Sequence, residues 1–119
     1  MNKRELTQFA NAAQKAIGLE HWDVDFIFTA TPPDDKGLAS AYDGGELGMC
    51  SVTDHHRMAT IWVNPTDTEG EHSTKDTIVH ELMHIYVAEL GIDIDCQDWR
   101  CEAGINKLSP LIVAAIDNT

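Results

Sequence analysis

The sequence predicts an α+β fold in a single domain, residues 1–119. We expect an N-terminal helix, a small, mostly antiparallel, twisted sheet of three or four strands, and two C-terminal helices. Near the N-terminus, apolar residues recur at helical spacing, and in the next segment they alternate with polar residues at strand spacing. Residues 73–90 form a long segment with apolar residues at most helical positions. With 119 residues, 43% of them apolar, the chain is long enough to bury one core.

The first half of the chain predicts one helix and then the strands. The apolar face of the helix runs from Leu6 to Ile17, and Gly18 can end it in the left-handed conformation. Residues 22–28 alternate between apolar and polar side chains, which is typical of a strand with one buried face. Residues 38–42 predict a short strand, and residues 47–52 and 58–63 predict a hairpin around residues 53–57.

The second half predicts two helices. Ser73, three residues before Asp76, is a weak capping-box pattern that opens a helix over residues 73–90. This helix is apolar around much of its circumference, so we expect it to be largely buried, with Gly91 as its C-cap. A second helix is expected from about residue 95 or 97 to 108, where Ser109 and Pro110 interrupt it before a last turn or two at 111–116.

Charge and composition narrow the classes of partner. Eight Lys and Arg residues stand against 20 Asp and Glu, for a formal net charge of −12. Nucleic-acid binders usually carry a basic patch, and anionic membrane surfaces repel a chain of this charge. We therefore expect neither nucleic acid nor a membrane as a partner, whereas a basic protein substrate would be attracted.

Targeting signals and cysteines predict a cytoplasmic location. The N-terminal residues do not lead into an apolar segment of the secretory type, and the longest aliphatic run, residues 111–116, is too short to span a bilayer. Cys50, Cys96 and Cys101 are an odd number without the spacing of a disulfide framework. A reducing, intracellular setting fits this usage.

Residues 80–84 read H-E-L-M-H within the apolar helix and are the most informative feature of the chain. Four residues make slightly more than one helical turn, so His80 and His84 project from one face and can share a zinc ion. Glu81 follows the first histidine directly, where its carboxylate can take a proton from a water that the metal activates. The motif predicts a zinc-dependent hydrolase.

A zinc hydrolase usually has three protein ligands, so the chain must supply one more. No histidine lies beyond the motif, and Val87 and Leu90 stand where the metzincin pattern needs Gly and His. Glu102 is the leading candidate, because an antiparallel helix pair would bring it over both histidines. Asn106 shares its face and could hydrogen-bond a zinc-bound imidazole. The remaining candidates are acidic and thiol side chains of the same region, Asp93, Asp95, Asp98, Cys96 and Cys101.

Over about residues 58–110 the chain resembles the gluzincin metallopeptidases, in which the motif helix supplies two histidines and the next helix a glutamate. The pattern from Glu102 through Asn106 to Pro110 also resembles the small ImmA/IrrE-like peptidases of bacteria and phages. The resemblance implies a zincin-like fold, one Zn²⁺ per chain held by His80, His84 and Glu102, and Glu81 as general base. The chain departs from larger gluzincins in having no tyrosine or histidine beyond Glu102 to stabilise an oxyanion.

The resemblance also implies how a substrate would bind. In gluzincins the strand before the motif helix holds substrate backbone by strand addition, and residues 59–64 occupy that position, with Ile61, Trp62 and Val63 at their centre. The expected function is therefore zinc-dependent hydrolysis of a peptide or protein substrate.

Two alternatives remain. The metal could clamp two helices or bind a partner protein without catalysis, or the motif could be accidental in a domain that binds no metal. A DNA-linked protease of the SprT type carries the same motif, but the acidic charge and the missing downstream histidine count against it.

Overall fold

The computed structural model describes residues 2–33, 38, 44, 47–53, 56–65, 71–90 and 99–118, and for residues 71–73 and 99–101 it describes the backbone alone. Its elements in chain order are α1 (Lys3–Ile17), β1 (Asp23–Phe28), β2 (Gly48–Thr53), β3 (Met58–Val63), α2 (Glu71–Glu89) and α3 (Trp99–Asp117). These elements confirm the predicted α+β class. The strand predicted at residues 38–42 falls almost entirely outside the described residues.

The sheet has the order β1-β3-β2, with β3 at the centre. β2 and β3 form the predicted antiparallel hairpin, in which Gly48 pairs with Val63 and Thr53 with Met58. β1 pairs with the other edge of β3 in the parallel direction, in register from Asp23 to Phe28. The sheet is therefore mixed, and the expectation of a mostly antiparallel sheet is wrong for the β1–β3 pair. Alternation along a segment identifies a strand but does not indicate its neighbour or its direction.

Helix α1 begins after Asn2 and ends at Gly18, as the sequence predicts for its C-terminus. The Asn2 side chain accepts a hydrogen bond of 2.9 Å from the Glu5 backbone N–H, and Gly18 closes the helix at a φ of 86°. Leu6 and Phe9 are buried on the face that looks toward α2 and the sheet.

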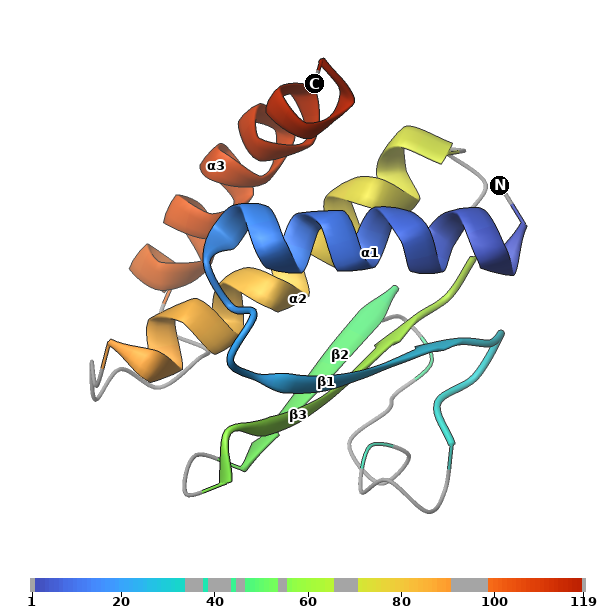
Figure 1. Ribbon diagram of the computed structural model, residues 1–119, viewed down its shortest axis with the longest axis horizontal. Coiled ribbons are helices and arrows are strands. Elements are labelled where there is room, and N and C mark those ends of the chain that lie inside the picture. The colour runs from blue at the N-terminus through green and yellow to red at the C-terminus, as the bar shows by residue number, and fades with distance from the viewer. Residues whose placement is uncertain are drawn as a thin grey trace.

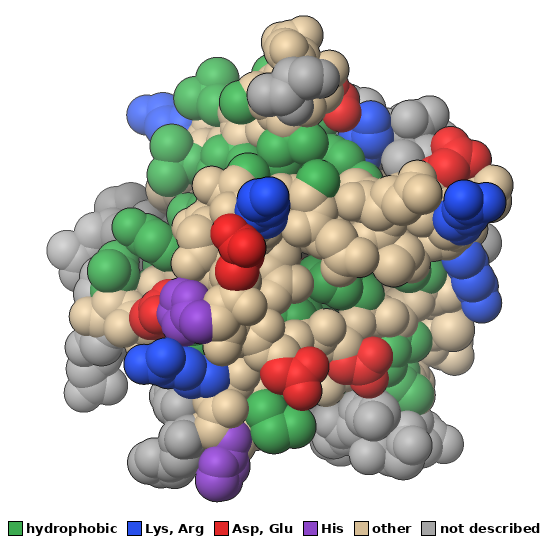
Figure 2. Space-filling view, in the orientation of Figure 1, with side chains coloured by type: hydrophobic (Ala, Val, Ile, Leu, Met, Phe, Trp, Pro, Cys, Tyr) green, Lys and Arg blue, Asp and Glu red, His purple; other side chains and the backbone are tan. Residues whose placement is uncertain are grey.

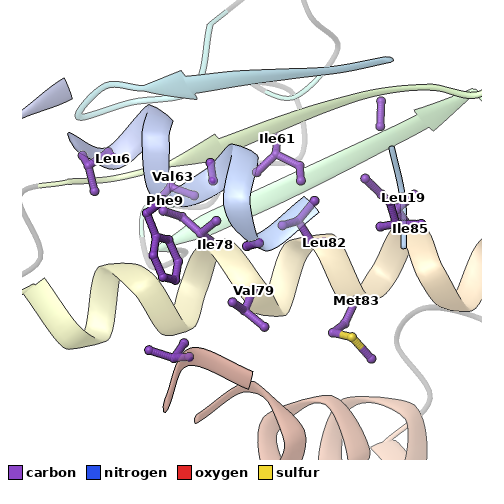
Figure 3. Packing of buried hydrophobic residues seen from close by; sticks show 14 of the residues in the cluster. Leu6, Phe9, Leu19, Ile61, Val63, Ile78, Val79, Leu82, Met83 and Ile85 are labelled. Atoms are coloured by element: carbon purple, nitrogen blue, oxygen red, sulfur yellow. The ribbon is translucent and has the colours of Figure 1, made fainter. Parts of the chain in front are cut away.

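The helices lie on one side of the sheet in two tiers (Figure 1). α1 and α2 pack on the sheet, and α3 packs on α2 and α1. α2 is therefore enclosed between the sheet and the other helices, which explains its apolar circumference. Ile78, Val79, Leu82 and Ile85 are fully buried. Figure 3 shows Ile78 and Leu82 on the side of α2 that faces the sheet, and Val79 on the opposite side, toward α3. Each such side chain contributes about 1.5–3 kcal/mol by leaving water.

Helix α3 continues through Pro110, although the sequence predicts a break there. A proline inside a helix removes one backbone hydrogen bond and costs about 3 kcal/mol. Pro110 itself is exposed, and the Ser109 hydroxyl donates a 2.8 Å hydrogen bond to the Ile105 carbonyl. Beyond the proline, Val113 is fully buried, and Ile112 and Ile116 pack against the core. Burial of these three side chains offsets the cost of the proline.

The outer surface of α3 carries exposed apolar side chains. Leu108 and Leu111 are 46% and 65% exposed, and Figure 2 shows hydrophobic side chains gathered over α3 at the top of the view. Within the residues that the structure describes, no helix is both long and apolar enough to cross a membrane.

Candidate metal centre

His80 and His84 lie one turn apart on α2 and face the same point. Their Nε2 atoms are 3.2 Å apart, and their rings meet edge to face with centroids 4.9 Å apart. Their side chains are 20% and 11% exposed, so the pair sits at the edge of the core. The helical spacing of the motif thus produces the predicted convergence of two imidazoles.

Glu102 completes this group from α3. Its Oε2 lies 3.2 Å from His80 Nε2, and its Oε1 lies 2.9 Å from His84 Nε2. The carboxylate reaches both histidines because α2 and α3 are antiparallel neighbours. The same arrangement brings Lys75, near the start of α2, to Asp117 at the end of α3, where the two side chains form a hydrogen bond. Of the other ligand candidates, Asp93, Asp95, Cys96 and Asp98 lie outside the described residues, as does the side chain of Cys101.

The three side chains fit a zinc ion in their spacing. Ligand atoms about 2.0–2.1 Å from one zinc, at tetrahedral angles, lie about 3.3–3.4 Å from one another. The two Nε2 atoms are 3.2 Å apart, and each lies 3.2 or 2.9 Å from a different oxygen of the Glu102 carboxylate, so these distances are close to that value. Two imidazole nitrogens and one carboxylate oxygen are also a ligand set typical of catalytic zinc, which keeps a fourth position for water.

Two carboxylates compete for the role of ligand. Ligand atoms of His80, Glu81 and His84 all lie within 4.8 Å of one another, so Glu81 is near enough to belong to the group. Only for Glu102, however, do the distances show direct contact with both Nε2 atoms. Glu81 directly follows His80 on the helix and therefore projects about 100° around the axis from the histidine face. Glu102 therefore contacts both rings, and Glu81 lies beside the three side chains.

Burial shifts the protonation of this group. Glu81 is 7% exposed, and burial, with a smaller contribution from the negative charge of Glu102, raises its pKa from 4.5 to about 8. Burial also lowers the pKa of His84, as does the neighbouring His80, although Glu102 acts in the opposite direction. A lowered pKa keeps the imidazole of His84 neutral, which is the form that binds a metal.

The predicted role of Asn106 stays a prediction. Asn106 is exposed on α3 and, with Asp76, Thr77 and His80, lines a cavity of about 160 Å³ between α2 and α3. This places it beside His80, as the spacing from Glu102 predicts. On His84, the buried Nδ1 atom has no hydrogen-bond partner among the described residues.

The predicted substrate strand is wrong. β3 is paired along its whole length with β1 on one side and β2 on the other, so it has no free edge to which a peptide could add. Ile61, Trp62 and Val63 are at most 1% exposed, and the Trp62 indole donates hydrogen bonds to the Thr29 carbonyl and hydroxyl oxygens. All three residues belong to the core.

The strand that lies at the edge next to the candidate centre is β2, which sequence reasoning did not select. Among the described strands it pairs with β3 alone, and it packs against α2. Its first residue, Gly48, lies against Thr77 and Glu81. Only the order of strands reveals this edge, and no local pattern in the sequence carries that information.

The other histidines do not reach the centre in the described residues. His56 is exposed in the hairpin turn, and His55 and the side chain of His72 lie outside the described residues. Glu89 is exposed near the end of α2, and its carboxylate contacts the His21 ring. No oxyanion donor is therefore assigned.

Comparison of this chain with protein-family models, curated proteins and solved structures found no match.

Proposed function

We propose that this protein is a zinc-dependent peptidase. The observation that carries the proposal is the convergence of His80, His84 and Glu102, whose ligand atoms lie 2.9–3.2 Å apart, beside the buried carboxyl group of Glu81. When bound, zinc would act as a Lewis acid that polarises a substrate carbonyl and lowers the pKa of a water to about 7.

Each protein group then has a defined task. His80 and His84 bind the metal as neutral imidazoles, and Glu102 adds one negative charge. Glu81 accepts a proton from the attacking water at its carboxylate and donates it to the leaving amine, while the carbon–nitrogen bond of the peptide breaks. A carboxyl group whose pKa is raised toward neutrality can perform both transfers, although a nearby cation would lower that pKa again.

A peptide substrate would lie along the outer edge of β2, the edge that faces away from β3, its only partner among the described strands. Edge strands present backbone N–H and C=O groups that can pair with an extended chain. Because Gly48 lies against Glu81, a peptide added to this edge would pass close to the general base. The net charge of −12 favours a basic substrate, and the odd number of cysteines favours an intracellular one.

Glu81→Gln tests the catalytic role. This variant should bind about as much zinc as the wild type, because the three ligands are untouched, but should cleave no member of a peptide library that the wild type cleaves. His84→Ala is the matched control, which should lose both zinc and cleavage. Full activity in Glu81→Gln would remove Glu81 from the mechanism.

One observation favours a non-catalytic function as the second candidate. The ligands come from two helices, so a metal at this site would tie α2 to α3. A metal clamp would raise stability in the wild type and in Glu81→Gln equally, with no peptide cleaved by either. Peptide cleavage by the wild type but not by Glu81→Gln would favour the peptidase function over the metal clamp.

A further inference from the structure

Position 48 has no room for a side chain. A Cβ atom there would lie 2.6 Å from Thr77 Cγ2, 3.2 Å from the Trp62 carbonyl oxygen and 3.3 Å from Glu81 Cγ. Because carbon atoms in contact are about 3.5–4.0 Å apart, the first distance is a clash and the third is tight. The φ of Gly48 is not in the left-handed region, so the lack of space, and not the backbone conformation, requires glycine here.

The surroundings of Gly48 leave few ways to relieve such a clash. The strand is held by the β2–β3 pairing of Gly48 with Val63 and by a 2.8 Å hydrogen bond from the Asn64 N–H to the Leu47 carbonyl. Thr77 is β-branched and helical, so its χ1 angle has few alternatives. A methyl group at position 48 would therefore push on the side chains of Thr77 and Glu81.

We propose that Gly48 is a positioning residue for Glu81. With no side chain, the start of β2 lies directly against α2 and holds the aliphatic part of Glu81 in place, which fixes its carboxyl group beside the metal ligands. None of the three atoms nearest to the added Cβ belongs to His80, His84 or Glu102, so the metal position itself is not touched. The catalytic part of this inference rests on the proposed peptidase function.

The test compares Gly48→Ala, Thr77→Ser and the double variant with the wild type. Gly48→Ala should keep one zinc per chain and a KM within a few-fold of the wild type, while kcat falls about 10- to 100-fold, as expected for a catalytic group displaced by less than 1 Å. Thr77→Ser removes the Cγ2 atom of the closest contact, so it should be nearly as active as the wild type and should restore much of kcat in the double variant.

Gly104→Ala is the matched control, because an added Cβ at this helical position of α3 meets no atom within 4 Å. It should leave kcat unchanged. Any of three results would overturn the proposal: Gly48→Ala keeps the wild-type kcat, Gly48→Ala has a raised KM with an unchanged kcat, or Thr77→Ser does not restore kcat in the double variant.

A crystal structure of zinc-free Gly48→Ala decides the positioning without reference to activity. The expected result is a displaced Glu81 carboxyl group, and an unmoved Glu81 would overturn the proposal. If Gly48→Ala does not fold, the structures of the double variant and of Thr77→Ser are compared in the same way. A displaced Glu81 in a protein whose wild type cleaves no peptide would leave the positioning intact and refute only the peptidase function.

Discussion

The buried carboxyl group of Glu81 should make the metal-free protein less stable as the pH rises. Between the usual pKa of 4.5 and the folded value of about 8, the folded chain holds a proton on Glu81 that the unfolded chain has lost. The free energy of unfolding should then fall by up to about 1.4 kcal/mol per pH unit in this window. At pH 7 the accumulated loss is about 3 kcal/mol, a large part of the stability of a small domain.

The lowered pKa of His84 has the opposite effect on the free energy of unfolding, which it decreases as the pH falls. Below about 6.5 the unfolded histidine takes up a proton more readily than the folded one, so its contribution to stability is lost as the pH falls. The two effects overlap below pH 6.5, and the range from 6.5 to 8 isolates Glu81. Over that range the wild type should lose about 2 kcal/mol through this residue.

Urea unfolding of chelator-treated protein at several pH values between 6.5 and 8, followed by circular dichroism, measures this slope. Glu81→Gln is the control, because the amide has a similar shape and does not titrate. Its absolute stability can change for other reasons, such as an unmet hydrogen bond, so the difference in slope is the diagnostic quantity. Equal slopes in the two proteins would refute the assignment of a raised pKa to a buried Glu81.

Three further predictions concern the metal and the packing. Zinc occupancy, measured by elemental analysis after dialysis, should fall as the pH drops below about 6.5, because a protonated histidine cannot bind metal; full occupancy at pH 4.5 would contradict histidine ligation. Trp62→Phe should lower the free energy of unfolding in urea by about 1–3 kcal/mol, because the Thr29 carbonyl loses its indole partner; an unchanged value would show that this bond contributes nothing. Lys75→Met should cost no more than about 1 kcal/mol in the same assay, because the bond from Lys75 to the partly exposed Asp117 is screened by water; a much larger loss would show that the ion pair holds α2 to α3.

The sequence predicted the parts of the site that depend on local geometry. The spacing of His80 and His84 places both rings on one face of any helix, and the apolar residues around them predict that the helix is buried. The prediction that Glu102 lies over both histidines depends on one further assumption, that the two helices are antiparallel. Its contacts with both rings agree with this assumption.

The parts that were missed depend on contacts between distant segments. Nothing in residues 58–63 indicates that the strand is paired on both sides, so the sequence predicts substrate binding by Ile61, Trp62 and Val63, which lie in the core. Pro110 predicted a helix end, but burial of residues beyond it, such as Val113, outweighs the local cost. The close approach of Gly48 to α2 exists only in the folded chain.

Zinc content per chain, by elemental analysis of protein purified without added metal or an affinity tag, tests the central claim most directly. The arrangement of His80, His84 and Glu102 predicts about one zinc per wild-type chain and almost none in His84→Ala. A wild-type value near zero that stays near zero after zinc addition and dialysis would contradict the metal centre and the peptidase function together.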